Sequence, residues 1–221
     1  MKLLVEATTK FVCGLLLVGL LIFLPAGTLG FMYGWLLVGL LFGPMLVAGF
    51  VMLAKSPEFL KKRLDAKEKQ GTQKGVVAFS GLMFIAGFVV AGLDYRFGWS
   101  TMPTWVVITA SVLFLAAYAL YAEVMRENAY LSRTIKVEEG QTVVDTGMYG
   151  IVRHPMYAVT ILLFLMIPLV LGSWYALMAF GFYPAVIAVR LKDEEDLLTR
   201  ELSGYCQYKQ KVRYRIIPFI W

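Results

Sequence analysis

Long apolar runs alternate with short polar segments along the chain, and this pattern predicts a bundle of membrane-spanning helices. The runs fall near 11–29, 31–54, 75–94, 104–125, 156–172 and 174–191. An α-helix needs roughly 20 apolar residues to cross a bilayer, and it satisfies its own backbone hydrogen bonds there. We therefore expect an all-α integral membrane protein with about six transmembrane helices. The short segment Leu171-Gly172-Ser173 predicts that the last two form a C-terminal helical hairpin.

Composition supports a single membrane domain covering 1–221, with N-terminal helices in 1–103 and the functional core in 104–221. The chain is 59% hydrophobic and only 16% charged, against roughly 25% charged in soluble domains. Lys2 and Lys10 before the first apolar run resemble a signal peptide. A second run follows at once, so we expect an uncleaved first helix.

The net charge of +6 is distributed in a way that indicates membrane orientation and not nucleic-acid binding. Of the 21 Lys and Arg residues, only Arg96 falls in the segments that six spans would place on one side of the membrane. The positive-inside rule then predicts that both termini and residues 126–156 face the cytoplasm. We expect the plasma membrane as the location and the lipid bilayer as the first partner, while the oligomeric state stays open.

The polar segment 141–157 holds the chemistry that stands out most. It contains His154, the one histidine of the chain, followed by Pro155. Proline disfavours helical geometry in the residue before it and suits a first helical turn, so Pro155 should begin a helix with His154 at its edge. The N–H groups of that helix start would suit an anionic ligand group. A loop that merely joins two spans is the alternative.

A second polar cluster, around Arg190 and Glu194, follows the last apolar run. Residues four apart lie on one face of a helix, and an exposed pair of this kind contributes about 0.3–0.5 kcal/mol. The predicted hairpin, however, would return this helix end to the level of His154. Cys13 and Cys206 fit neither a disulfide framework nor a zinc site, and no metal-ligand cluster is expected.

The order of these residues resembles the isoprenylcysteine carboxyl methyltransferase family over roughly 104–221. The motifs that carry the resemblance are Thr146-Gly147-x-Tyr149, Arg153-His154-Pro155-x-Tyr157, Arg190 with Glu194-Glu195 and Leu198, Tyr205-x-x-Tyr208, Val212 and Pro218. The resemblance implies a cytoplasmic pocket for S-adenosylmethionine, with S-adenosylhomocysteine as product. It also implies a lipophilic small-molecule or lipidated acceptor that reaches the pocket through the bilayer.

The resemblance also implies residue roles. Arg190 would bind the acceptor and act at the catalytic centre. Cofactor contacts would come from Gln141, Thr142, Val143, Val144, Tyr149, His154, Pro155, Met156, Tyr157 and Glu194.

The chemistry of these residue types agrees with those roles. A carboxylate suits the ammonium or ribose of the cofactor, a tyrosine ring can face the sulfonium, and arginine can clamp a carboxylate in bidentate fashion. Three alternatives stay open at this point: a phospholipid N-methyltransferase, an NADPH-dependent membrane reductase of related plan, and a non-enzymatic helical membrane protein.

Overall fold

The computed structural model describes residues 2–64, 71–131, 135 and 137–221, and every regular element among them is helical. The elements are α1 (Lys2–Ala26), α2 (Met32–Lys55), α3 (Pro57–Leu64), α4 (Gly71–Phe97), α5 (Thr104–Glu127), η1 (Gly147–Gly150), α6 (Pro155–Val170), α7 (Trp174–Phe180), α8 (Tyr183–Glu201) and α9 (Tyr205–Lys211). Residues 65–70, in the polar segment between the second and third apolar runs, and residues 132–134 and 136 lie outside the described residues. The all-α prediction is confirmed for the part described.

Among the described residues, five helices are long and apolar enough to cross a membrane: Lys2–Ala26, Met32–Lys55, Gln73–Phe97, Thr104–Glu127 and Trp174–Glu201. The last joins α7 to α8 through a short break at Gly181 and Phe182. The remaining predicted span, 156–172, is α6, an apolar helix of 16 residues. At 1.5 Å per residue it is about 24 Å long, short of the roughly 30 Å hydrocarbon core. The structure therefore supports five of the six predicted spans.

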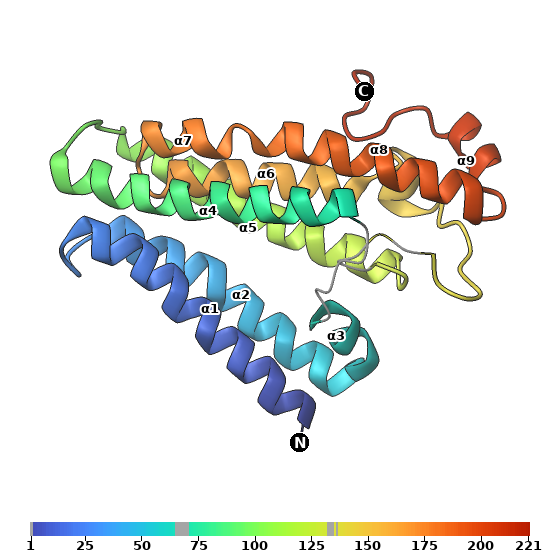
Figure 1. Ribbon diagram of the computed structural model, residues 1–221, viewed down its shortest axis with the longest axis horizontal. Coiled ribbons are helices and arrows are strands. Elements are labelled where there is room, and N and C mark those ends of the chain that lie inside the picture. Colours follow the sequence, from blue (N-terminus) through green and yellow to red (C-terminus); the bar gives the residue numbers. More distant parts are fainter. Residues whose placement is uncertain (1, 65–70, 132–134, 136) are drawn as a thin grey trace.

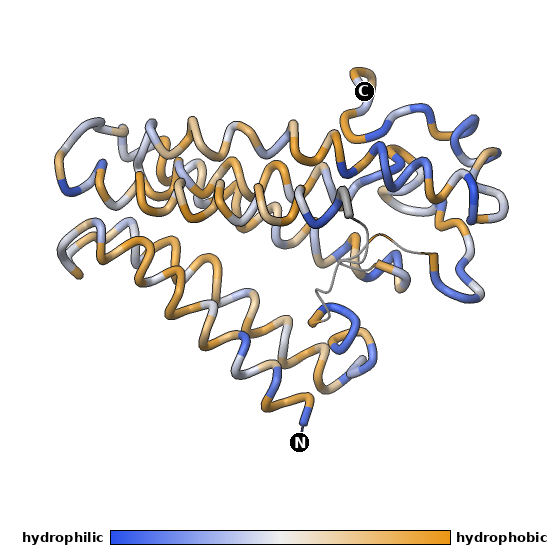
Figure 2. Tube along the Cα trace, viewed as in Figure 1, coloured by the Kyte–Doolittle hydropathy of each residue, from blue (hydrophilic) through white to orange (hydrophobic). Residues whose placement is uncertain are grey.

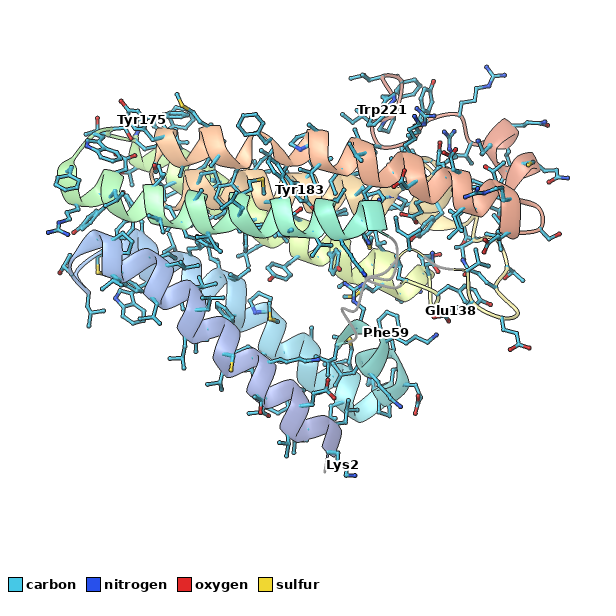
Figure 3. The ribbon with its side chains drawn as sticks, in the orientation of Figure 1. Lys2, Phe59, Glu138, Tyr175, Tyr183 and Trp221 are labelled. Carbon is cyan, nitrogen blue, oxygen red and sulfur yellow. The ribbon has the colours of Figure 1, made fainter. Side chains whose placement is uncertain are left out.

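Helix α6 occupies the centre of the bundle, enclosed by α4, α5, α7 and α8 (Figure 1). The predicted hairpin is confirmed, because the chain turns at Leu171–Ser173 and α7 and α8 return alongside α6. Aromatic rings fill the space between these helices, with Phe84 in edge contact with Phe164 and Phe180. Tyr183 of α8 points into the same layer (Figure 3).

Two glycines of α4 allow its neighbours to approach closely. A Cβ on Gly92 would lie 2.5 Å from the carbonyl oxygen of Ile22 in α1, and one on Gly87 would lie 2.4 Å from the ring of Phe180 in α7. Helices packed this closely gain dispersion contacts, which replace hydrophobic driving force inside lipid. These contacts fix α1 and α7 against α4 near the end of the bundle that carries the α6–α7 turn.

The hairpin of α1 and α2 diverges from the other helices toward the end that carries α3 (Figure 1). Buried residues of α1 are confined to its last turns, at Ile22, Phe23 and Ala26. Figure 2 shows apolar residues along the whole hairpin, as expected for helices that face lipid. Polar residues gather at the end of the main bundle that is farthest from the α6–α7 turn, around α9 and the start of α6. We call this end of the bundle the polar end.

The α6–α7 turn end is held by a buried carboxylate. Asp94, 2% exposed, accepts hydrogen bonds from the backbone and hydroxyl of Ser100 at 2.7 and 2.6 Å, and from the hydroxyl of Ser173. The guanidinium of Arg96, two residues after Asp94, lies over the ring of Phe97. Burial explains the hydrogen bonds of Asp94, since a carboxylate away from water requires close donors.

Candidate functional site

The chain enters α6 through a backbone fixed by the C-terminal tail. The N–H groups of Arg153 and His154 donate to the carbonyls of Tyr214 and Arg215 at 2.9 and 2.8 Å. Pro155 occupies the first helical position, as predicted. Fewer backbone N–H groups than expected are therefore available to an anion at this helix start. Proline has no N–H, and the N–H of His154 is already taken by Arg215.

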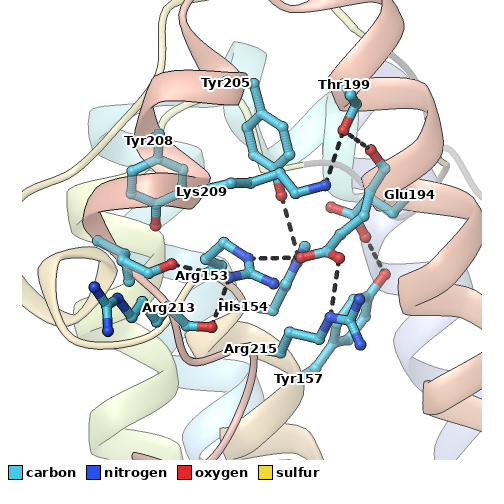
Figure 4. A network of polar contacts seen from close by, with 12 residues as sticks. Arg153, His154, Tyr157, Glu194, Thr199, Tyr205, Tyr208, Lys209, Arg213 and Arg215 are labelled. Atoms are coloured by element: carbon cyan, nitrogen blue, oxygen red, sulfur yellow. Dashed lines mark hydrogen bonds and ion pairs between the residues drawn. The ribbon is translucent and has the colours of Figure 1, made fainter.

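Glu195 of α8 is the centre of a buried ionic cluster at this point (Figure 4). Its Oε1 accepts from Arg153 Nε at 2.6 Å and lies 3.3 Å from His154 Nε2. Its Oε2 accepts from Arg215 Nε at 3.0 Å. The cluster joins the entry of α6, the middle of α8 and the C-terminal tail, so its first role is to hold the polar end together.

The sequence analysis gave Glu195 no role of its own. A signal was present, because Ile187, Leu191 and Glu195 follow at intervals of four and are all buried in α8. A carboxylate on an apolar stripe requires a partner inside the protein. Arg153, part of the same motif as His154, is the partner that the pattern alone could not assign.

Tyr157 connects the two residues that the sequence analysis placed in the second polar cluster. Its hydroxyl donates to Glu194 Oε2 and accepts from Arg190 Nε at 3.2 Å. Arg190 and Glu194 are both half-buried, so the interpretation of an exposed pair is wrong. The prediction that α8 returns its polar end to the level of His154 is confirmed, since Glu195 and His154 are in contact.

Gln73 extends this network to α4. Its side chain is fully buried. The Nε2 atom donates to Asp193 Oδ2 at 2.6 Å, and the Oε1 atom accepts from Arg190 Nη1 at 3.3 Å. Gln73 was missed by the sequence analysis because a glutamine at the start of an apolar helix carries no sign of its partner 117 residues away.

One pocket at the polar end brings most of the predicted site residues together. Its wall includes the predicted Gln141, Thr142, Val143, Val144, Tyr149, His154, Met156, Tyr157, Arg190 and Glu194. Pro155 is buried at the helix start and is absent from that wall. The wall also includes residues to which no binding role had been given: Asn128, Tyr130, Leu131, Ile135, Arg153, Leu197, Leu198, Leu202, Tyr205 and Tyr208.

The strip from Gln141 to Val144 has neither helix nor strand geometry, and it rests on the tail. Val143 packs on a small apolar cluster made by Leu198, Leu202, Tyr205, Tyr208 and Val212. The hydroxyl of Tyr208 donates to the carbonyl of Tyr149 at 2.7 Å. The Tyr-x-x-Tyr motif thus supports both the strip and the loop before α6.

The pocket combines opposite charges with neutral hydroxyls. Arg153 and Arg190 supply cations and Glu194 supplies a carboxylate, while Glu195, which is not part of the wall, pairs with Arg153. Burial raises the pKa of the Tyr149 phenol above its ordinary value, so this group stays neutral and can donate or accept a hydrogen bond. Among the described residues, no three His, Cys, Asp or Glu side chains gather as a metal site would require.

Comparison with known proteins gives a family for the part of the chain that forms this pocket. Residues 105–200 match the model of the Isoprenylcysteine carboxyl methyltransferase (ICMT) family. The match confirms the resemblance drawn from the sequence motifs.

Two curated relatives are similar to shorter stretches. The uncharacterized protein YpbQ of Bacillus subtilis (strain 168) is 31% identical over 96 residues, 43% of this chain and 57% of YpbQ. The Delta(14)-sterol reductase of Methylotuvimicrobium alcaliphilum is 25% identical over 135 residues, 54% of this chain and 32% of the reductase. The matches therefore cover less than two thirds of either relative.

Proposed function

Because residues 105–200 match the isoprenylcysteine carboxyl methyltransferase family, we propose that the protein methylates a lipophilic acceptor with S-adenosylmethionine. The proposed acceptor group is the carboxylate of an isoprenylcysteine-like or related lipid. One observation carries the proposal. Tyr157 links Glu194 and Arg190 at a pocket that also contains the strip 141–144 and the loop before α6. A carboxylate and a guanidinium are thereby fixed beside one another, ready for a cationic and an anionic ligand.

The chemistry of the pocket fits the cofactor. S-Adenosylmethionine supplies a methyl group activated on a sulfonium, and it also carries an ammonium, a carboxylate and ribose hydroxyls. Glu194, oriented by the Tyr157 hydroxyl, would hold the ammonium or the ribose. The rings of Tyr149 and Tyr157 can face a sulfonium, a contact of about 0.5–2 kcal/mol. Gln141, Thr142, Val143, Val144, His154 and Met156 would complete the contacts.

Arg190 is the residue that we assign to the acceptor. Its Nε is held by Tyr157 and its Nη1 by Gln73, at 3.2 and 3.3 Å, so the guanidinium plane is set before an acceptor arrives. Preorganised donors of this kind orient a reacting carboxylate at little further cost. An ionised carboxylate is already a nucleophile, so no general base is required. Glu195 is consistent with that, because its two oxygens are engaged by arginines.

The cofactor is tested by calorimetry on the purified protein in detergent. We expect binding of S-adenosylmethionine and of S-adenosylhomocysteine, and none of NADPH. The likeness to the Delta(14)-sterol reductase makes NADPH the informative competitor. Binding of NADPH alone would favour a reductase, and binding of neither ligand would favour a non-enzymatic membrane protein.

The acceptor is tested by transfer of a labelled methyl group to defined lipids in mixed micelles. We expect transfer to N-acetyl-S-farnesylcysteine, which presents an isoprenylcysteine carboxylate, and none to phosphatidylethanolamine. Transfer to the amine lipid instead would make the protein a phospholipid N-methyltransferase. The cofactor would stand in that outcome, and only the acceptor assignment would fail.

Three substitutions separate the roles of the linked residues. Glu194→Gln should weaken S-adenosylmethionine binding, whereas Arg190→Ala should leave that affinity near normal while turnover collapses. Arg190→Lys keeps the charge and loses the planar fork, so it should also turn over poorly. Tyr157→Phe removes the shared hydroxyl and should impair both. Equal loss of cofactor affinity in Arg190→Ala and Glu194→Gln would overturn the assignment of Arg190 to the acceptor.

A further inference from the structure

The last residues of the chain form an ordered loop with an unusual closure. The carbonyl oxygen of Trp221 accepts from the N–H groups of Arg215, Ile216 and Ile217 at 2.9, 3.0 and 3.1 Å. The carbonyl of Ile217 in turn accepts from Ile220 and Trp221 at 3.2 and 3.1 Å. Five backbone hydrogen bonds therefore hold a segment of only seven residues, and its side chains have fixed directions.

The loop leaves apolar side chains exposed, although the Phe219 ring also contacts Tyr214, with 5.3 Å between the ring centroids. Phe219 is 86% exposed and Ile220 is 78% exposed, and Ile217 and Trp221 are exposed beside them. Phe219 has a φ of 65°, a left-handed conformation that costs a non-glycine residue of order 1–3 kcal/mol. A strained backbone that presents a phenylalanine to the outside is difficult to explain if the outside is water.

The loop lies beside the bundle and not beyond its polar end. Figure 1 shows the chain returning from α9 along α8, so that the terminus lies level with the start of α4. Figure 3 places Trp221 on the same outer flank of α8. The contact of Arg215 with Glu195 at 3.0 Å anchors the loop at this level. Glu195 lies four residues after the end of the last apolar run, 174–191, so the loop is anchored close to the boundary between the apolar and polar parts of this helix.

The charges of the preceding segment match a lipid surface. Residues 202–221 contain Lys209, Lys211, Arg213 and Arg215 and no acidic residue. Lys211 and Arg215 pair with Asp145 and Glu195, so Lys209 and Arg213 supply the charge for a lipid surface. Basic residues next to a membrane are attracted to anionic headgroups, by about 1 kcal/mol each. Tryptophan is enriched at the same depth, where one edge of the ring meets lipid and the other meets water.

We propose that the loop 217–221 is an interfacial anchor that inserts into the lipid leaflet on the side of the pocket. Phe219 and Ile220 enter the boundary between headgroups and acyl chains, and Lys209 and Arg213 contact the headgroups. The residues just before the anchor contact the pocket. The carbonyls of Tyr214 and Arg215 accept hydrogen bonds from the backbone N–H groups of Arg153 and His154. The inference is independent of the proposed methyl transfer, since it concerns only where the loop lies.

The test places a fluorescent probe at the tip of the loop in the full-length protein. Cys13 and Cys206 are exposed and are replaced by serine, and Phe219→Cys is labelled with an environment-sensitive nitrobenzoxadiazole. The protein is reconstituted in vesicles of phosphatidylcholine and phosphatidylglycerol. We expect a blue-shifted emission, strong quenching by lipids with a nitroxide near the glycerol end of the acyl chain, and weak quenching by aqueous iodide.

The native Cys206 provides the matched control, because it is exposed on α9 in the same tail. Labelled there, with Cys13 replaced, the probe should emit as in water and respond to iodide. A second probe at Ile220→Cys covers the case in which loss of the Phe219 ring relaxes the loop. Iodide quenching at both 219 and 220 equal to that at 206 would overturn the proposal. So would quenching that depends on protein density and not on the nitroxide lipid, which would indicate contact with a second copy.

Discussion

Arg153 and Glu195 form an ion pair of 2.6 Å between Nε and Oε1, with side chains only 6% and 4% exposed. The pair joins Arg153, two residues before α6 begins, to the middle of α8. The Nη1 atom of the same guanidinium donates to the carbonyls of Val212 and Arg213 at 2.9 and 2.7 Å. One side chain therefore fixes three segments that are distant in the sequence and that together form the pocket wall.

Removing the charge of Glu195 should destabilise the protein strongly. Glu195→Gln leaves Arg153 buried without its counter-charge, which typically costs about 3–5 kcal/mol. We expect a large fall in the unfolding midpoint temperature of the purified protein in detergent. Glu201→Gln, an exposed carboxylate at the end of the same helix, is the control and should leave the midpoint almost unchanged. Equal midpoints for both variants would show that the ion pair does not hold the polar end together.

Gln73 should affect the acceptor more than the cofactor. Gln73→Leu keeps the size of the side chain and removes its contacts with Arg190 and Asp193. A hydrogen bond to a charged group contributes about 1.5–3 kcal/mol, so we expect KM for N-acetyl-S-farnesylcysteine to rise about 10- to 100-fold. The affinity for S-adenosylmethionine, measured by calorimetry, should stay near normal. Gln210→Leu, on the exposed surface of α9, serves as control, and an equal loss of cofactor affinity in Gln73→Leu would contradict a positioning role.

Buried tyrosines of α9 should make the protein sensitive to alkali. Burial raises the pKa of the phenols of Tyr205 and Tyr208 above the ordinary value of about 10. The unfolded chain then loses these protons first, so the stability they contribute is complete below about pH 10 and is lost as pH rises through the folded-state pKa. The free energy of unfolding should fall above about pH 10, by at most about 1.4 kcal/mol per pH unit for each phenol, and the unfolding midpoint temperature should fall with it.

Tyr208→Phe isolates this contribution. The variant also loses the hydrogen bond to the Tyr149 carbonyl, so its stability is lower at every pH. Its alkaline slope, however, should be shallower than that of the native protein. Tyr175→Phe, at an exposed position of α7, should retain the native slope. Identical slopes in all three proteins would exclude Tyr208 as a source of the pH dependence.

The predicted orientation can be tested with thiol labels at sites that the structure shows to be exposed. Gly172 is a poor site, because its φ is positive and a Cβ there would lie 2.9 Å from the ring of Tyr33. Trp99 and Tyr175 are 46% and 45% exposed at the end opposite the pocket. We expect a membrane-impermeant maleimide to label Trp99→Cys and Tyr175→Cys from outside intact cells, and native Cys206 only after lysis. Labelling of Cys206 from outside would reverse the orientation.

The helical class, the helical hairpin of the last segments and half of the residues of the pocket wall could be predicted from the sequence alone. The reason is that apolar periodicity and length are local properties, and so is the start of α6 at Pro155. The motif order was equally informative, since the residues it singled out in 141–157 and around Arg190 line one pocket. Their binding roles stay predictions. The predicted run 156–172 and helix α6 have nearly the same length, and both are shorter than the roughly 20 residues of a typical span.

Only the tertiary structure decided which polar groups meet. Glu194 and Glu195 are neighbours in the sequence, yet a rotation of about 100° per residue along the helix directs one to Tyr157 and the other to Arg153. Gln73 reaches Arg190 only because α4 packs against α8. The tail contributes carbonyl groups to Arg153 and His154, and backbone acceptors have no sequence signature. Such pairings depend on how distant helices pack, which the local pattern of the chain does not specify.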